Sequence, residues 1–415
     1  MLVRNARQLL TLQGPNRPRR GAELNDLGVI IDGAVLIVDG IIREVGPTRR
    51  LENLSMARGA LEINASGRVV LPGFIDSHTH LVGPPPRFPN PGDETGFLTY
   101  DRLIRGEVNL IGDMSSRLLV SDAVRVLKDC LRQGTTTLEA KSGQACDEPG
   151  ELRILKADAA LRSGPVSVVS TFMGARFLPA AEQLRREAHV AWLCDHMLPL
   201  VARRRLAEFV DIECEEGAFD LEQTRRFLLA ARQLGFGLKM HASQFWNIGA
   251  VRLGVELGVT SIDHLIYLDD SDMDHLANSE TIATLLPGGL FHLGYQRYPA
   301  ARALIDRGAA VALATNYNVD TSPSPSMQMM IGLACRRMQM TPAEAISAST
   351  INAAHALRRG DHIGSLEIAK DANLVILDAR DYREIPQRFG VNLVETTIKE
   401  GRVVYHEPDI EWNAA

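Results

Sequence analysis

Eight short apolar runs, separated by segments with helical periodicity, constrain the fold of this chain of 415 residues more than any other feature. The helical segment 221–234, which Gly235 ends, is typical of those between the runs. Buried parallel strands have this apolar pattern, and eight strand-then-helix units predict an α/β fold with a TIM-type (β/α)₈ barrel. The eight runs are 69–75, 134–138, 166–171, 209–213, 237–241, 261–264, 282–286 and 310–315.

The two ends of the chain differ from this central part. Residues 29–46 are rich in β-branched residues with glycine at expected turns, and 372–378 and 396–405 have the same composition. We therefore expect a small β-sandwich domain formed by residues 1–68 together with 362–410. Residues 69–361 are expected to form the barrel, with an active site at the carboxyl ends of its strands.

Charge and composition argue against several classes of partner. The formal net charge is −6 and no dense stripe of Lys and Arg is present, so neither nucleic acid nor a membrane surface is expected as a partner. No apolar stretch is long enough to span a bilayer, and the first residues do not resemble a signal peptide. Five widely spaced cysteines indicate neither disulfides nor a thiolate zinc site. The expected location is the cytoplasm.

His78-Thr79-His80 is the pattern that points to a metal. It lies at the end of the first predicted barrel strand, and residues two apart in a strand face the same side. His241, His264 and Asn316 follow or end later predicted strands. Neutral imidazoles suit Zn²⁺, Fe²⁺ or Mn²⁺, so we expect one divalent ion. The alternative is a set of polar core histidines without metal.

The stretch Pro72-Gly-Phe-Ile-Asp-Ser-His-Thr-His80 resembles the first metal-binding motif of the amidohydrolase superfamily. Within that superfamily the chain resembles the imidazolonepropionase family, whose members open a ring in histidine degradation. Nearly the whole chain takes part in this resemblance. Further matching stretches are 134–143, 171–175, 211–219, 261–265, 312–318, 340–345 and 364–370.

The resemblance implies roles for several residues. His78, His80 and His241 take the positions of metal ligands, and His264 takes that of a histidine near the reacting water. Arg87 matches an arginine that holds the substrate carboxylate. The implied reaction is hydrolysis of a C–N bond in a small anionic cyclic amide, and we expect a homodimer.

Two carboxylates of the family pattern are amides in this chain. Gln244 replaces a glutamate that handles the proton of the water, and Asn316 replaces a metal-binding aspartate. Both changes keep the size of the side chain and remove a proton acceptor. We therefore expect His264 to serve as the base, Gln244 to stay in the catalytic set, and Asn316 to give the metal at most a weak contact.

The predicted pocket also departs from the family pattern. Gln144 stands in place of a tyrosine and Arg176 in place of a histidine. With Arg87, both are expected to contact the substrate, and two guanidinium groups favour an anion. A surface position is the alternative for Arg176. Cys146, in the same region, is interpreted as a small buried residue rather than a nucleophile.

These departures leave two alternatives to an imidazolonepropionase-like hydrolase. One is an amidohydrolase of different specificity, which cleaves another lactam or amide or removes an amino group. The other is a binding protein that has lost catalysis together with its carboxylates. All four histidines are retained, which favours an enzyme.

Overall fold

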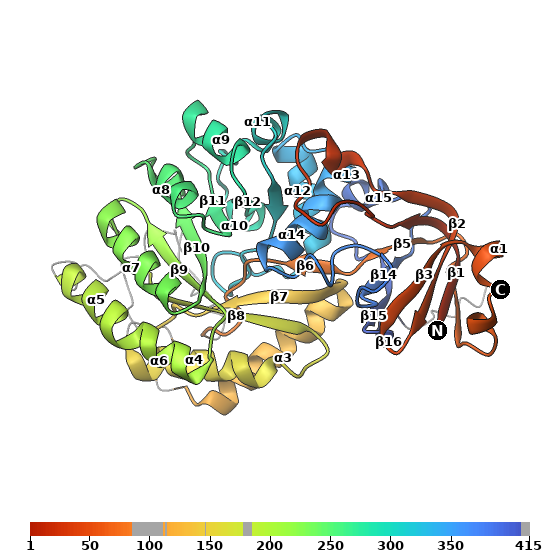
Figure 1. Ribbon diagram of the computed structural model, residues 1–415, viewed down its shortest axis with the longest axis horizontal. Coiled ribbons are helices and arrows are strands. Elements are labelled where there is room, and N and C mark those ends of the chain that lie inside the picture. The colour runs from red at the N-terminus through yellow and green to blue at the C-terminus, as the bar shows by residue number, and fades with distance from the viewer. Residues whose placement is uncertain (85–110, 113, 146, 177–184, 408–415) are drawn as a thin grey trace, which may run out of the picture.

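The computed structural model describes residues 1–84, 111–112, 114–145, 147–176 and 185–407. Two eight-stranded sheets organise the chain: one is parallel, and the other is a mixed sheet built from both ends of the chain (Figure 1).

The parallel sheet contains strands β6 to β13 in chain order, and every neighbouring pair runs parallel. Each run predicted as a barrel strand contributes to one of them, so the prediction of eight parallel strands is confirmed. The strands are β6 (Phe74–Asp76), β7 (Thr135–Lys141), β8 (Ser167–Ala175), β9 (Phe209–Cys214), β10 (Gly237–Ala242), β11 (Ser261–His264), β12 (Ile282–Leu285) and β13 (Val311–Leu313).

Hydrogen bonds just beyond the strand ends bring β13 and β6 together and nearly close the barrel. The backbone N–H of Asn316 donates to the carbonyl oxygen of His78 at 3.0 Å, and that of His80 donates to Tyr317 at 2.8 Å. The side chain of Asp76 accepts from the backbone N–H of Thr315 at 3.0 Å. The closure therefore joins the segments that carry His78, His80 and Asn316.

Helices lie between successive strands and cover the outside of the barrel (Figure 1). The predicted helix 221–234 is α7, with Asp220 as its N-cap and Gly235 at φ +85 just after it. The main helices are α3 (Ser116–Arg132), α4 (Glu148–Leu161), α5 (Arg186–Trp192), α6 (Leu198–Arg204), α7 (Leu221–Gln233), α8 (Ala250–Glu256), α9 (Asp270–Ala277), α10 (Pro287–His292), α11 (Ala301–Asp306), α12 (Met327–Arg337), α13 (Pro342–Ala348) and α14 (Ile351–Ala356).

The run 69–75, expected as one barrel strand, is divided between the two sheets. Strand β5 (Val69–Pro72) pairs with the mixed sheet, and only β6 belongs to the barrel. Gly73 separates them, and a Cβ atom there would lie 2.4 Å from Cγ2 of Thr136. Glycine is required at this junction because the chain passes so close to β7.

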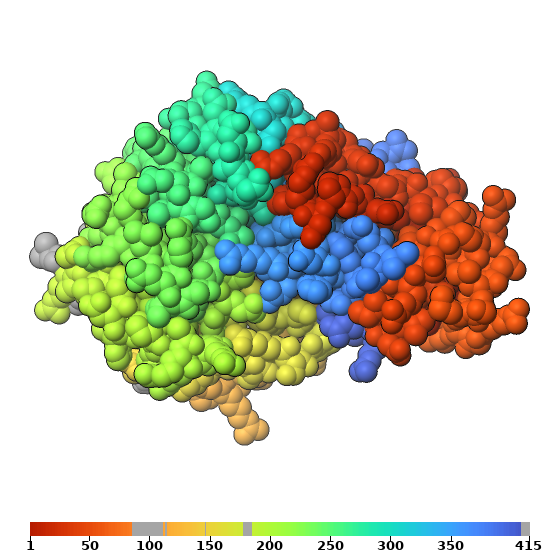
Figure 2. Space-filling view, in the orientation of Figure 1, coloured from red at the N-terminus to blue at the C-terminus, as the bar shows by residue number. Residues whose placement is uncertain are grey.

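The mixed sheet unites the two ends of the chain, whose residues lie side by side in Figure 2 (red and blue). Strand β5 connects them, because it pairs with β1 on one side and with β14 on the other. The strands of the mixed sheet are β1 (Leu2–Leu10), β2 (Val29–Val38), β3 (Ile41–Pro47), β4 (Glu62–Asn64), β5, β14 (Leu374–Leu377), β15 (Val394–Lys399) and β16 (Arg402–His406).

Short helices complete the terminal parts of the chain: η1 (Gly21–Asn25), α1 (Thr48–Leu51), η2 (Ser55–Ala57) and α15 (Glu384–Gln387). A π-helical turn, η4 (Leu193–Met197), joins α5 to α6. None of the helices in the described ranges is both long and apolar enough to cross a membrane.

Candidate metal centre and active site

Four histidines converge at the carboxyl ends of three barrel strands. His78 and His80 follow β6, His241 lies in β10, and His264 ends β11. The ring centroids of His78 and His241 are 4.7 Å apart, and those of His241 and His264 are 5.0 Å apart. All four side chains are at least 94% buried. The structure therefore brings together the histidines that the sequence analysis singled out.

The histidines do not contribute equally to the tightest group. The ring nitrogens of His78, His241 and His264 lie within 4.8 Å of one another, as a shared ion requires. The ring of His80 is 5.6 Å from that of His78 and 6.4 Å from that of His241. The predicted ligand set of His78, His80 and His241 thus stays a prediction, and His264 lies close enough to be a further candidate.

The hydrogen bonds of these histidines leave two buried ring nitrogens without a partner among the described residues. Nδ1 of His78 lies 2.6 Å from Asp263, and Nδ1 of His241 lies 2.9 Å from Asp211. Nε2 of His78 and Nδ1 of His80 are buried with no hydrogen-bond partner in the described part of the chain. A carboxylate behind each ring and an open nitrogen in front are typical of histidines that bind a metal. The residues present therefore fit a divalent ion.

Burial keeps the imidazoles of His78, His80 and His264 neutral. It lowers the pKa of His78 well below its usual value, and the positive charge of Lys141 lowers it further. Burial together with Arg176 has the same effect on the pKa of His80, and burial together with His241 lowers that of His264. Neutral imidazole is the form that binds a metal or accepts a proton.

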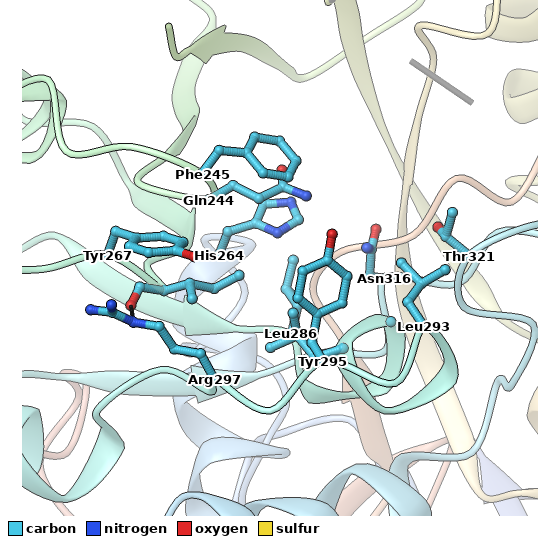
Figure 3. Close-up of a pocket in the computed structure, with 13 residues that line it drawn as sticks. Gln244, Phe245, His264, Tyr267, Leu286, Leu293, Tyr295, Arg297, Asn316 and Thr321 are labelled. Carbon is cyan, nitrogen blue, oxygen red and sulfur yellow. Dashed lines mark hydrogen bonds between the residues drawn. The ribbon is translucent and has the colours of Figure 1, made fainter. Parts of the chain in front are cut away.

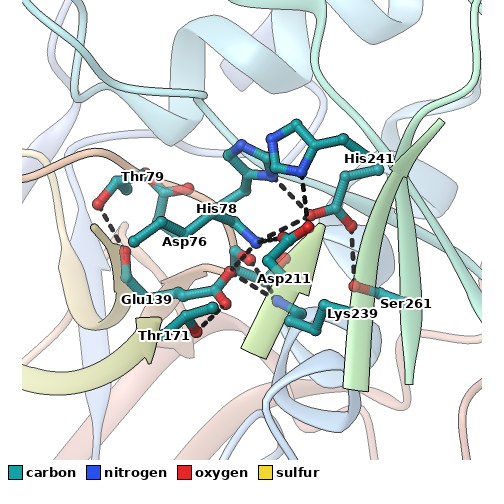
Figure 4. Close-up of polar contacts among 12 residues, drawn as sticks. Asp76, His78, Thr79, Glu139, Thr171, Asp211, Lys239, His241 and Ser261 are labelled. Carbon is teal, nitrogen blue, oxygen red and sulfur yellow. Dashed lines mark hydrogen bonds and ion pairs between the residues drawn. The ribbon is translucent and has the colours of Figure 1, made fainter. Parts of the chain in front are cut away.

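A buried network of charged side chains supports the histidines from below (Figure 4). Nζ of Lys141 contacts three carboxylates: Asp211 at 2.5 Å, Glu139 at 3.2 Å and Asp263 at 3.2 Å. Nζ of Lys239 lies 2.6 Å from Glu139. All five side chains have no exposed surface. Such a network orients the rings because none of its members can move without leaving a buried charge unpaired.

The sequence analysis did not recognise this network. Its residues occur two apart in the strands, as Glu139 and Lys141 in β7 or Lys239 and His241 in β10, and therefore face the same side. Charged residues inside buried strands are the signal that would have revealed it. The register of β10 against β11 then places His241 opposite Asp263.

Asp211, His241 and Asp263 also have ligand atoms within 4.8 Å of one another. Nζ of Lys141 already contacts both carboxylates of this group. Although burial opposes ionisation, Lys141 and His241 keep the pKa of Asp211 below its usual value. Lys141 already supplies a positive charge to the group of Asp211, His241 and Asp263. The histidine group is therefore the better candidate for a metal ion.

Four residues around the histidines adopt left-handed backbone conformations. Ser243 has φ +54, His264 +84, Leu265 +57 and Asn316 +55. These values are uncommon for residues other than glycine and cost of order 1 kcal/mol or more each. They occur at or just after the ends of β10, β11 and β13, next to His241 and His264.

A pocket opens beside His264. Gln244 and Asn316, the two amides predicted to stand in place of family carboxylates, line it together with aromatic and apolar residues (Figure 3). The remaining lining residues are Phe245, Ile266, Tyr267, Leu286, Gly289, Leu290, Leu293, Tyr295, Arg297 and Thr321.

A buried carboxylate holds Gln244 in place. Glu215 accepts hydrogen bonds from the backbone N–H groups of Gln244 and Trp246, the latter at 3.3 Å. Burial raises the pKa of Glu215 to about 7. The sequence analysis included Glu215 in a family motif without assigning it this position.

Gln144 and Arg176, which are predicted to contact the substrate, differ in how deeply they are buried. Gln144 is 5% exposed, in a loop whose backbone donates to Glu151 from Gly143 and Ala145 at 3.1 Å. Arg176 is half-buried, and its Nη1 donates to the carbonyl oxygen of Gly143 at 3.1 Å. Its charge also lowers the pKa of His80. The structure thus places Arg176 next to the site.

Arg87 and Cys146 lie outside the described residues. The predicted contact of Arg87 with a substrate carboxylate and the interpretation of Cys146 as a buried small residue therefore stay predictions.

Comparison with known proteins gives one family and a consistent set of relatives. A model of the amidohydrolase family matches residues 69–404. Imidazolonepropionase of Bacillus cereus (strain B4264) is 37% identical over 421 residues, which cover 100% of this chain and 99% of the relative. Imidazolonepropionase of Parabacteroides distasonis is 39% identical, covering 97% of this chain and 98% of the relative.

Solved structures of lower identity share the fold. Atrazine chlorohydrolase TrzN from Arthrobacter aurescens TC1, complexed with zinc, is 16% identical with a TM-score of 0.71, covering 98% of this chain and 95% of that chain. A zinc-bound adenosine deaminase from Xanthomonas campestris is 16% identical with a TM-score of 0.68, covering 97% and 92% respectively. At this identity the likeness concerns the barrel with its terminal sheet and not the substrate.

Proposed function

Because the chain belongs to the amidohydrolase family, and to the imidazolonepropionases within it, we propose that it hydrolyses 4-imidazolone-5-propanoate to N-formimidoyl-L-glutamate with the help of one divalent metal ion. The water oxygen bonds to the ring carbonyl carbon, the C–N bond breaks, and the leaving ring nitrogen takes a proton. The single observation that carries this proposal is the group of buried, neutral histidines with open ring nitrogens at the barrel mouth.

We propose that His78, His80 and His241 hold the ion, with at most a weak contact from Asn316. Zn²⁺ and Fe²⁺ suit this donor set best, and Mn²⁺ is an alternative. A bound ion of this kind polarises a carbonyl group and makes water more acidic. The carboxylates of Asp263 and Asp211 would fix the rings of His78 and His241 through their Nδ1 atoms.

His264 is the group proposed to take the proton from water. Its imidazole is neutral, it lines the pocket, and its ring lies 5.0 Å from that of His241. Gln244 and Asn316 cannot accept a proton at neutral pH, so their role is to orient water or substrate through hydrogen bonds. His264 then returns the proton to the leaving nitrogen.

Arg176 and Gln144 are proposed to contact the substrate beside His80, together with Arg87 from sequence alone. A guanidinium group near the site favours a substrate that carries a carboxylate, such as the propanoate arm. Glu151 supports this side of the site because it holds the loop that carries Gln144.

The experiment that tests the proposed function is product identification by NMR after incubation of the metal-loaded protein with 4-imidazolone-5-propanoate. N-formimidoyl-L-glutamate should form with wild type. His264→Asn, which removes the base without touching the predicted ligands, should lower kcat by about 10²- to 10⁴-fold. Absence of product from the metal-loaded wild type would contradict the proposal.

A different specificity within the amidohydrolases is the second candidate. Gln244 and Asn316 favour it, because both carry neutral side chains where carboxylates are expected, and no Asp or Glu is among the described residues that line the pocket. An enzyme of this kind would hydrolyse another lactam or amide, or would deaminate its substrate. It would form no product from 4-imidazolone-5-propanoate.

The broader organisation of the chain is also part of the proposal. We propose that residues 1–68 and 362–410 form one domain, folded as a sandwich around the apolar cluster that includes Val3, Val35 and Leu374. Residues 69–361 would form the TIM-type barrel domain, except that β5 pairs with the mixed sheet. The homodimer and the cytoplasmic location expected from the sequence stay predictions.

A further inference from the structure

One wall of the pocket is formed by the segment that follows α10. The backbone N–H of Tyr295 donates to the carbonyl oxygen of Leu290 at 2.9 Å, and Gly294 at φ +72 makes the turn before it. The side chain of Tyr295 is 41% exposed and lines the pocket. In Figure 3 its hydroxyl group is directed toward the end of the pocket at which His264, Gln244 and Asn316 lie. The fold thus presents a phenol to the reacting end of the pocket.

The polar groups on the pocket wall are almost all uncharged. The thirteen described residues that line it include one arginine, Arg297, and no Asp or Glu. The guanidinium group of Arg297 lies 4.2 Å from the ring centroid of Tyr267, at the edge of the pocket (Figure 3). A cation gains nothing from such a wall, whereas a neutral polar ring can satisfy its hydroxyl and amide groups.

Gln244 supplies an acceptor that has no partner. Its Oε1 atom is buried and makes no hydrogen bond to any described residue, and the side chain is 7% exposed. A buried acceptor left unpaired destabilises the fold, so its position in the pocket calls for a donor from the ligand. The N–H group of a ring amide is a donor of the right kind.

We propose that Tyr295 and Gln244 together recognise the amide edge of the substrate ring: the hydroxyl group of Tyr295 donates to the ring carbonyl oxygen, and Oε1 of Gln244 accepts from a ring N–H. This proposal rests on the proposed function and adds Tyr295 to the residues that contact substrate. As the carbonyl oxygen gains negative charge during hydrolysis, the hydrogen bond from the phenol becomes stronger.

The test compares Tyr295→Phe with Tyr298→Phe in the metal-loaded, full-length protein. Each variant loses one hydroxyl group, but that of Tyr298 is buried without a partner in the described chain, and Arg337 lies over its ring outside the pocket. Tyr295→Phe should lower kcat/KM for 4-imidazolone-5-propanoate about 10- to 100-fold, mostly through kcat. Tyr298→Phe should stay within about twofold of wild type.

Equilibrium binding separates this inference from the proposed function. Hydantoin-5-propanoate, a cyclic probe with adjacent N–H and C=O groups and a carboxylate arm, should bind to wild type and Tyr298→Phe equally. It should bind to Tyr295→Phe about fivefold or more weakly. The wild type could show this binding pattern and still fail to hydrolyse 4-imidazolone-5-propanoate. That result would support the inference and contradict only the proposed function. Equal binding by Tyr295→Phe and wild type, or no binding to wild type, would overturn the inference.

Discussion

The Nδ1 atom of His78 lies 2.6 Å from Oδ2 of Asp263, while the opposite ring nitrogen of His78 is buried without a hydrogen-bond partner among the described residues. The carboxylate fixes both the orientation and the tautomer of the ring. Nε2 of His78 is thereby directed toward the other histidines, whose nitrogens lie within 4.8 Å. This relationship is the geometric basis for proposing a metal site at these histidines.

Asp263→Asn should weaken metal binding while His78 itself is unchanged. An amide cannot supply the negative charge that makes the imidazole a stronger ligand, and loss of such a partner weakens binding about 10- to 100-fold. The dissociation constant for Zn²⁺, measured by competition with a chromogenic chelator, checks this. Asp306→Asn removes an exposed carboxylate and is the control. An unchanged constant for Asp263→Asn would contradict the assignment of His78 as a ligand.

Lys141→Met should destabilise the fold itself. The lysine contacts three buried carboxylates, and although burial opposes its charge, these groups raise the pKa of Lys141 above its usual value. Removing one partner of a buried charge network costs about 3–5 kcal/mol. Urea unfolding should show this loss, with Lys156→Met, an exposed lysine on α4, close to wild type. Equal stability of the two variants would mean that the network is not paired as described.

Asp158→Asn should raise stability at high pH and leave it unchanged at low pH. Both carboxylate oxygens of Asp158 are buried without hydrogen-bond partners in the described chain, and burial raises its pKa well above the usual value. Since the folded pKa lies above the unfolded one, the stabilising contribution is present below the unfolded pKa and is lost as pH rises toward the folded pKa.

The free energy of unfolding of Asp158→Asn should therefore exceed that of wild type by about 1–3 kcal/mol at about pH 8 and match it near pH 4. Chemical unfolding at both pH values measures the difference. Asp195→Asn, at an exposed position, should show no such dependence. A gain in the free energy of unfolding that is the same at both pH values would exclude ionisation of the Asp158 carboxyl group as its cause.

Gln244→Glu combined with Asn316→Asp should raise kcat/KM for 4-imidazolone-5-propanoate about tenfold or more, because it restores a proton acceptor beside His264. Steady-state kinetics of wild type and the double variant give the answer. A decrease would show that the two amides are adaptations to another substrate. No change would mean that neither side chain touches the reacting water.

Sequence patterns predicted the architecture because barrel strands are continuous apolar runs. All eight predicted runs contribute to the parallel strands β6 to β13. The exception is the division of 69–75 at Gly73, which depends on the contact with Thr136 and so on tertiary structure. The histidines could be singled out because each follows or ends a predicted strand, and carboxyl ends of strands meet at one edge.

Other parts of the site depend on distances between strands that a sequence does not contain. Lys141 contacts Asp211 and Asp263 from different strands, and only the barrel brings them together. Tyr295 lies in a segment without a recognised motif, and its place in the pocket follows from the turn after α10. The sequence also does not show that His80 lies outside the tight group formed by the other three histidines, because this depends on distances in the folded chain.

Titration of the metal-free protein with Zn²⁺ or Fe²⁺, with hydrolysis of 4-imidazolone-5-propanoate followed at each addition, tests metal-dependent ring opening most directly. The proposed ion, held by histidines around one centre, predicts activity that rises from zero and stops rising at about one equivalent per chain. Activity that is already full without metal, or absent at every metal concentration, would contradict the account.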